Sequence, residues 1–125
     1  MILADTSVWI DHLRHGDAVL ATLLGSGRVL MHPFVIGELA LGNLRQRDPI
    51  LRDLRNLPQA VCASDPEVSH FIERATLYGL GIGYIDAHLL AAARLTPGGS
   101  LWTRDKRLRR AAERLGLSAP MAKTL

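Results

Sequence analysis

Short apolar segments that alternate with helix-forming stretches constrain the fold of this chain more than any other feature. Residues 2–4, 28–31 and 100–103 are too short for buried helices and are rich in residues typical of strands. A further short strand is expected at 59–63. Strands that alternate with helices predict an α/β domain, with a mostly parallel central sheet of about four to five short strands flanked by helices.

Between these segments, apolar residues recur at intervals of three and four, as on the buried face of a helix. The predicted helices begin with serine, threonine, aspartate, proline or tyrosine, and most of them end near glycine or proline. They run from Thr6 or Ser7 to Gly16, from Asp17 to Gly25, from Pro33 to Leu44, from Asp48 to Pro58, from Ser64 to Gly79, from Tyr84 to Leu95 and from Asp105 to Gly116.

Length and composition predict one cytoplasmic domain over residues 1–125. A chain of 125 residues with 48% hydrophobic and 22% charged residues is ordinary for a single globular domain. No apolar run approaches the roughly 20 residues of a membrane span, and the first residues lack the pattern of a signal peptide. Cys62 is the only cysteine and has the apolar neighbours Val61 and Ala63, so we expect a buried thiol.

Four acidic residues are placed where parallel strands would bring them together. Asp5 and Asp105 each directly follow a predicted strand. Asp86 lies in the first turn of a helix after a glycine-rich break, and Glu38 lies about one turn into the helix that begins at Pro33. Ligands of such sheets gather beyond the carboxyl ends of the strands, so these side chains are expected to converge at one edge.

Each of these acids, taken alone, is better explained as a helix cap or as a first-turn residue favoured by the helix dipole. This explanation is weaker for Asp5 and Asp105, because a neighbouring serine or threonine offers an alternative cap. It is weakest for Glu38, which stands between the apolar residues Ile36 and Leu39. A carboxylate in apolar surroundings carries a desolvation cost unless it meets a cation.

A divalent cation would relieve the repulsion among four converging carboxylates. Oxygen ligands, with no histidine or cysteine at metal-binding spacing, favour Mg²⁺ or Mn²⁺ over zinc. Such an ion activates water and neutralises charge that develops on a phosphate during in-line attack. The acids together therefore predict metal-dependent hydrolysis of a phosphodiester.

Basic residues are concentrated in the last third of the chain. The net charge is +3, and the chain from Arg94 onward has eight basic residues, including Lys123, against two acidic ones. Arg107, Arg110 and Arg114 fall along one outer stripe of the last predicted helix, and Arg104 and Lys106 lie beside Asp105. Arginine suits phosphate geometrically, which predicts a nucleic-acid surface here, with a solvated helix face as the alternative.

Over essentially its whole length the chain resembles the PIN-domain family, in particular the VapC-type toxins of bacterial toxin–antitoxin pairs. Four segments in the family's order carry the resemblance. They are Ile2-Leu3-Ala4-Asp5-Thr6-Ser7-Val8, Pro33 with Glu38-Leu39, Asp86-Ala87-His88-Leu89-Leu90-Ala91-Ala92-Ala93, and Leu101-Trp102-Thr103-Arg104-Asp105 with Leu108. Tyr84 and Ile85 depart from the family, whose members have small or polar residues near the start of this helix.

The resemblance implies a divalent-metal-dependent endoribonuclease that acts on structured RNA, forms a homodimer and is inhibited by a cognate antitoxin. The catalytic and metal-site acids would be Asp5, Glu38, Asp86 and Asp105, supported by the hydroxyls of Thr6 or Ser7 and of Thr103. The RNA-binding residues would be Arg104, Lys106, Arg107 and Arg110.

Two other functions are compatible with the pattern: a non-catalytic domain that binds RNA or protein, and a metal-dependent DNA nuclease or phosphatase. The leucine-rich segment 39–57, with Trp9, predicts either a groove for an antitoxin or dimer partner, or ordinary core packing. His88 is expected to point away from Asp86 on its helix, as a surface or core residue rather than a base.

Overall fold

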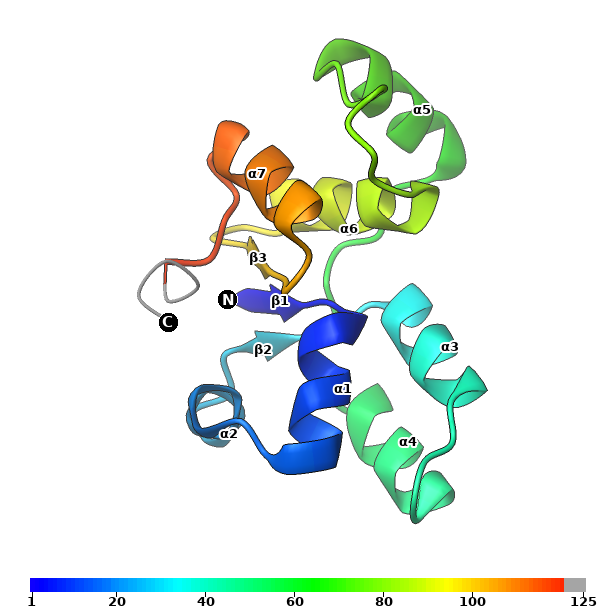
Figure 1. Cartoon of the computed structure of the whole chain (residues 1–125), viewed down its shortest axis with the longest axis vertical. Helices are drawn as coiled ribbons and strands as arrows, with labels where there is room; N and C mark the ends of the chain where they lie inside the picture. Colours follow the sequence, from blue (N-terminus) through cyan, green and yellow to red (C-terminus); the bar gives the residue numbers. More distant parts are fainter. Residues whose placement is uncertain (121–125) are drawn as a thin grey trace.

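Three parallel strands lie at the centre of the structure, which is a computed structural model that describes residues 1–120 (Figure 1). Helices precede, follow and connect the strands. In chain order the elements are β1 (Ile2–Ala4), α1 (Thr6–His15), α2 (Ala18–Gly25), β2 (Val29–Leu30), α3 (Pro33–Leu41), α4 (Arg47–Arg55), α5 (Asp65–Arg74), α6 (Tyr84–Leu95), β3 (Ser100–Trp102) and α7 (Lys106–Arg114). None of the described helices has both the length and the apolar character needed to cross a membrane.

The predicted α/β class and parallel sheet are confirmed. β1 is the central strand, with β2 on one side and β3 on the other. Leu3 of β1 lies opposite Leu30 of β2 and Leu101 of β3, and all three side chains are buried. In Figure 1, α2 and α4 lie toward the β2 side of the sheet, whereas α6 and α7 lie toward the β3 side. Because the strands are parallel, their carboxyl ends meet at one edge.

The predicted number of strands is wrong, since residues 1–120 form three strands rather than four or five. The expected strand at 59–63 is reduced to a single parallel bridge between Met31 and Gln59. Pairing stops there because the backbone N–H of Val61 donates to the side-chain hydroxyl of Thr96, at 2.9 Å, instead of to a strand. The segment therefore turns away from the sheet and leads into α5.

The predicted helix starts are confirmed more often than the ends. Asp17 caps α2, and Ser64 caps α5 in a reciprocal capping box with Glu67. By contrast, α3 ends at Leu41 rather than Leu44, because Gly42 adopts an extended conformation.

Core packing accounts for part of the leucine-rich segment. Leu39, Leu51, Leu54 and Trp9 are buried in the main hydrophobic cluster, whereas Leu41 is 90% exposed, so the groove for a partner stays a prediction. Close to this core, the prediction of a buried thiol is wrong. Cys62 is exposed, because the chain turns outward between the buried Ala60 and Ala63.

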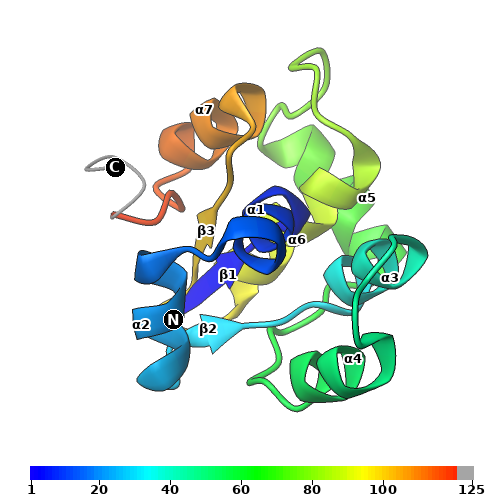
Figure 2. The same cartoon turned by 60° about the horizontal axis from the view of Figure 1, so that its bottom comes forward.

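α5 lies beside α6, as Figure 2 shows from another direction, and a smaller hydrophobic cluster joins the two helices. Ala87 and Ala91 of α6 contact Val68 of α5, with Phe71 and Ile72 packed around them. The small alanine side chains let the two helices approach closely, so α6 lies between the sheet and α5.

Candidate active site

Asp86 is the residue through which the predicted acids interact. Its negative charge raises the pKa of Asp5, and the charges of Asp105 and Glu38 raise the pKa of Asp86 itself. The ends of β1 and β3 lie side by side here, since the N–H of Asp5 donates to the carbonyl of Trp102 at 3.0 Å. The four acids therefore lie within electrostatic range of one another at one edge of the sheet.

Asp5 is the most buried of the four, with 6% of its surface exposed. Its Oδ1 accepts hydrogen bonds from Ser7 Oγ at 2.5 Å and from the N–H of Val8 at 3.3 Å, and its Oδ2 accepts one from Thr103 Oγ1. Burial raises the pKa of Asp5 above its ordinary value, the three hydrogen bonds oppose that shift, and Asp86 adds to it. The carboxylate is thus fixed in orientation but destabilised in its charged form.

The two hydroxyls that bind Asp5 also bind the segment that leads into α7. Ser7 Oγ accepts from the N–H of Arg104, and Thr103 Oγ1 accepts from the N–H of Asp105, both at 3.0 Å. Each hydroxyl therefore donates to one acid and accepts from the backbone near another. This arrangement holds the start of α7 in a fixed position relative to Asp5 and is compatible with the supporting role predicted for these side chains.

Glu38 differs from its sequence-based description, because its side chain is exposed rather than surrounded by apolar residues. Val35 and Leu39 of α3 face the core, whereas Glu38 lies on the outer face of the same helix. The desolvation argument for this residue was therefore wrong. Thr6 Oγ1 nevertheless donates to Glu38 Oε1 at 2.6 Å and holds the carboxylate at the start of α1.

The acids of this site cap helices and also lie near one another. A capping role therefore does not exclude a shared role in one site. Asp5, rather than Thr6 or Ser7, is the N-cap of α1, and Asp105 is the N-cap of α7. Asp86 Oδ2 accepts from the N–H of Gly83 at 3.0 Å within the first turn of α6. Burial is nevertheless the largest influence on the Asp86 pKa, which lies above its ordinary value.

The oxygen donors fit a hydrated divalent cation better than a fully protein-ligated one. Within residues 1–120, one oxygen each of Glu38, Asp86 and Asp105 accepts no hydrogen bond. No group of three Asp, Glu, His or Cys side chains in this range is close enough to ligate one ion together. Mg²⁺ keeps several waters when it binds protein, so two carboxylates and a water shell are a compatible set.

The basic residues near Asp105 are used in different ways. Arg104 Nη2 lies 2.7 Å from Asp17 Oδ2, and Nε lies 3.1 Å from Asp11 Oδ2. Its guanidinium is therefore paired with two acids of the same chain at the surface, which sequence reasoning did not anticipate. Lys106, Arg107 and Arg110 are exposed on α7. Lys123 lies outside the described residues.

A cluster of aromatic and titratable side chains joins α3, α5 and α6, and the sequence pattern did not reveal it. Asp65 Oδ1 accepts from Tyr84 Oη at 2.9 Å and lies 3.1 Å from Nε2 of the buried His88. The rings of Phe34 and Tyr84 both contact His88 edge-on at 4.7 Å between centroids. The bulk of Tyr84 is therefore part of a packed cluster, and His88 is a core residue as expected.

His32 adjoins this cluster and is also buried. Its Nδ1 accepts from the N–H of Phe34 at 3.0 Å, and its Nε2 has no hydrogen-bond partner within the described residues. Burial, with a smaller contribution from His88, lowers the pKa of His32 to about 4. The ring is thus neutral at physiological pH.

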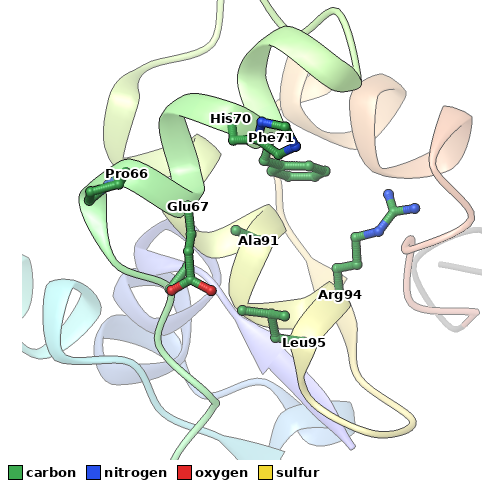
Figure 3. Close-up of a pocket in the computed structure, with 8 residues that line it drawn as sticks. Pro66, Glu67, His70, Phe71, Ala91, Arg94 and Leu95 are labelled. Carbon is green, nitrogen blue, oxygen red and sulfur yellow. The ribbon is translucent and has the colours of Figure 1, made fainter.

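A mostly apolar cavity lies away from the acids, between α5 and α6 (Figure 3). It measures about 400 Å³ and includes Phe71, Arg94 and Leu95 among its lining residues. The guanidinium of Arg94 lies 5.5 Å from the Phe71 ring centroid. The acid in its wall, Glu67, accepts from the N–H of Ser64 as part of the α5 cap. None of the four predicted acids lines this cavity, so the candidate active site is the carboxylate cluster.

Comparisons with known proteins point in the same direction as the geometry. The profile of the PIN domain family matches residues 2–114. Over 118 residues the chain is 49% identical to Ribonuclease VapC32 of Mycobacterium tuberculosis strain CDC 1551 / Oshkosh, a match that covers 94% of this chain and 95% of that protein. Ribonuclease VapC32 of strain ATCC 25618 / H37Rv matches to the same extent. The resemblance inferred from four sequence segments is confirmed, and the chain belongs to the PIN domain family.

Proposed function

We propose that this chain is a divalent-metal-dependent endoribonuclease and the toxin component of a toxin–antitoxin pair. The observation that carries the proposal is the placement of the acids: Thr103 hydrogen-bonds Asp5 and the N–H of Asp105, and Thr6 donates to Glu38. Burial and the neighbouring acids together raise the pKa of Asp86. The 49% identity to a protein named as a ribonuclease supports RNA as the substrate.

In this proposal two of the four acids would ligate the cation directly, and the others would contact its water shell. Bound Mg²⁺ or Mn²⁺ would supply an activated water and neutralise charge on the phosphate. Ser7 and Thr103 keep Asp5 in one orientation, and Thr6 does the same for Glu38. Without the ion, these carboxylates repel one another. The hydrogen bonds from the three hydroxyls keep the carboxylates in position despite this repulsion.

We also assign RNA contacts to the exposed basic residues Lys106, Arg107 and Arg110, which follow Asp105 on α7. They would bind phosphates that flank the cleaved bond, because an acidic site alone repels a polyanion. Structured RNA is the proposed substrate class, as the resemblance implies.

The proposed partners are a cognate antitoxin and a second copy of this chain, and the proposed location is the cytoplasm. The resemblance to VapC-type toxins and the similarity to Ribonuclease VapC32 support these proposals. Expression of the chain alone should arrest growth, and co-expression with the product of a short adjacent gene should restore it. Light scattering of the purified protein measures whether it is a dimer.

The decisive experiment compares cleavage of an RNA hairpin and a DNA hairpin of the same sequence, with Mg²⁺, with Mn²⁺ and with a chelator. Asp5→Asn keeps the shape of the side chain but removes its charge, so we expect RNA cleavage to be lost. Asp53→Asn, which alters an exposed acid on α4, is the matched control and should cleave like the wild type. If Asp5→Asn cleaves RNA as fast as the wild type, the carboxylate cluster is not the active site. Cleavage of DNA alone would support the DNA nuclease alternative.

A further inference from the structure

Three arginines of α7 line a single cavity at the surface. The cavity measures about 300 Å³ and is bounded by Arg107, Arg110 and Arg114 together with Gly79, Leu80 and Ala111. No acidic side chain is among these lining residues. Like charges spaced three and four residues apart on a helix repel one another and destabilise the helix slightly. An anion bound among the three arginines would relieve this repulsion.

Two of the three arginines contact the chain between α5 and α6. Arg114 Nη2 donates to the carbonyl oxygens of Ala75 and Thr76, at 2.6 and 3.2 Å. Arg107 packs so closely on Gly81 that a Cβ added there would lie 2.8 Å from its Nη1. Arg114 is therefore held at the wall of the cavity by two hydrogen bonds, and the exposed Arg107 lies against Gly81 beside it.

Arg110 stands between them and makes no hydrogen bond or ion pair within the described residues. Its guanidinium retains its donors for a ligand. An arginine fork matches the oxygens of a phosphate, and walls that are already ordered lower the entropy cost of binding.

We propose that this cavity is a phosphate subsite for the RNA substrate, in which Arg110 and Arg107 contact the anion and Arg114 positions the wall. This inference rests on the proposed ribonuclease function. Arg110 lies five residues beyond Asp105, or about 7.5 Å along the helix axis. This offset from Asp105 assigns the subsite to a phosphate that flanks the cleaved bond and not to the phosphate of the cleaved bond itself.

Binding measured without cleavage tests the subsite separately from catalysis. In the Asp5→Asn protein, we expect Arg110→Ala to weaken binding of an RNA hairpin about tenfold and to reduce the slope of log K against log salt by about one. Arg55→Ala removes an exposed arginine of α4 and should change neither quantity. An Arg110→Ala protein that has the same thermal stability, affinity and salt slope as its parent overturns the proposal.

A scan with single neutral methylphosphonate linkages locates the bound phosphate. One neutral linkage that flanks the cleaved position should weaken binding to the parent protein but not to Arg110→Ala. Identical scans for the two proteins would overturn the assignment. Inorganic phosphate is the second probe, followed through the amide signals of α7; if it competes with the RNA at equal concentration, the site is one for free phosphate and not for the RNA backbone.

The two proposals fail in distinguishable ways. Cleavage by the wild type with unaltered binding by Arg110→Ala overturns the subsite and leaves the ribonuclease. Loss of binding by Arg110→Ala without any cleavage by the wild type supports the subsite and overturns the ribonuclease.

Discussion

Arg104 and Asp17 form a 2.7 Å ion pair that joins the connection between β3 and α7 to the start of α2. The same guanidinium reaches Asp11 of α1 at 3.1 Å and lies 5.4 Å from the Trp102 ring. The backbone N–H of Arg104 donates to Ser7, which in turn donates to Asp5. Arg104 therefore stabilises the position of the segment that carries Asp105. Its guanidinium contacts Asp11 and Asp17 rather than the acids of the candidate site.

Arg104→Ala should lower the free energy of unfolding by about 1 kcal/mol, because the pair is only partly shielded from solvent. It should weaken RNA binding less than Arg110→Ala does, since its charge is already paired. Urea denaturation of Arg104→Ala, Asp17→Asn and the double variant measures the coupling. If the losses of unfolding free energy in the two single variants add up to the loss in the double variant, Arg104 and Asp17 do not stabilise each other.

Asp86→Asn should lower the pKa of Asp5, because it removes a negative charge that disfavours ionisation of the buried carboxyl. Ser7→Ala should have the opposite effect, since it deletes a hydrogen bond to the charged form. Carbon-13 NMR titration of the side-chain carboxyl groups in metal-free protein measures both. The expectation fails if the two variants shift the Asp5 pKa in the same direction.

As the pH is lowered, the rate of RNA cleavage should begin to fall at a higher pH than it would if the carboxyl groups had ordinary pKa values. Burial and mutual repulsion raise the pKa values of Asp5 and Asp86, and both must be deprotonated to hold a cation. The pH profile of kcat/KM at several Mn²⁺ concentrations tests this. More Mn²⁺ should move the acidic limb to lower pH, and a limb independent of the metal concentration would argue against the acids as ligands.

Stability should fall as the pH drops from about 6.5 to about 4, because His32 resists protonation in the folded state. The folded pKa is about 4 and the unfolded value about 6.5, so the unfolded chain binds more protons in this window. The loss attributable to His32 is at most about 3 kcal/mol and is absent above the unfolded pKa. His32→Asn keeps an acceptor for the N–H of Phe34 but cannot titrate. Denaturation at a series of pH values should give a flatter curve for this variant than for wild type.

Gly81→Ala should destabilise the protein by about 1–3 kcal/mol. Gly81 has φ = +77°, which L residues rarely adopt, and its added Cβ would meet Arg107. Combining it with Arg107→Ala removes the clash but leaves the backbone strain, so only part of the stability should return. Gly37→Ala is the control: nothing lies near the added Cβ on α3, and stability should rise by up to about 1 kcal/mol.

Features of the fold set by neighbouring residues were predictable from the sequence. The caps at Asp17 and Ser64 depend on residues three positions away, and both are confirmed. The placement of Asp5 and Asp105 at strand ends also followed from the local pattern.

Features that depend on distant partners were not predictable. Residues 59–63 fail to form a strand because Val61 bonds to Thr96, 35 positions later. The engagement of Arg104 depends on Asp17, 87 positions earlier. The exposure of Glu38 depends on how α3 is rotated about its axis, and an apolar sequence context does not determine that rotation.

The hydrogen bond between Thr103 and Asp5 joins residues 98 positions apart, across the central strand and a neighbour that comes late in the chain. During translation, Asp5 leaves the ribosome long before β3 and the start of α7 do. The carboxylate cluster therefore cannot be completed on a nascent chain that stops short of residue 105. In the proposed ribonuclease, a product that ends before residue 105 would lack the complete site and should not cleave RNA.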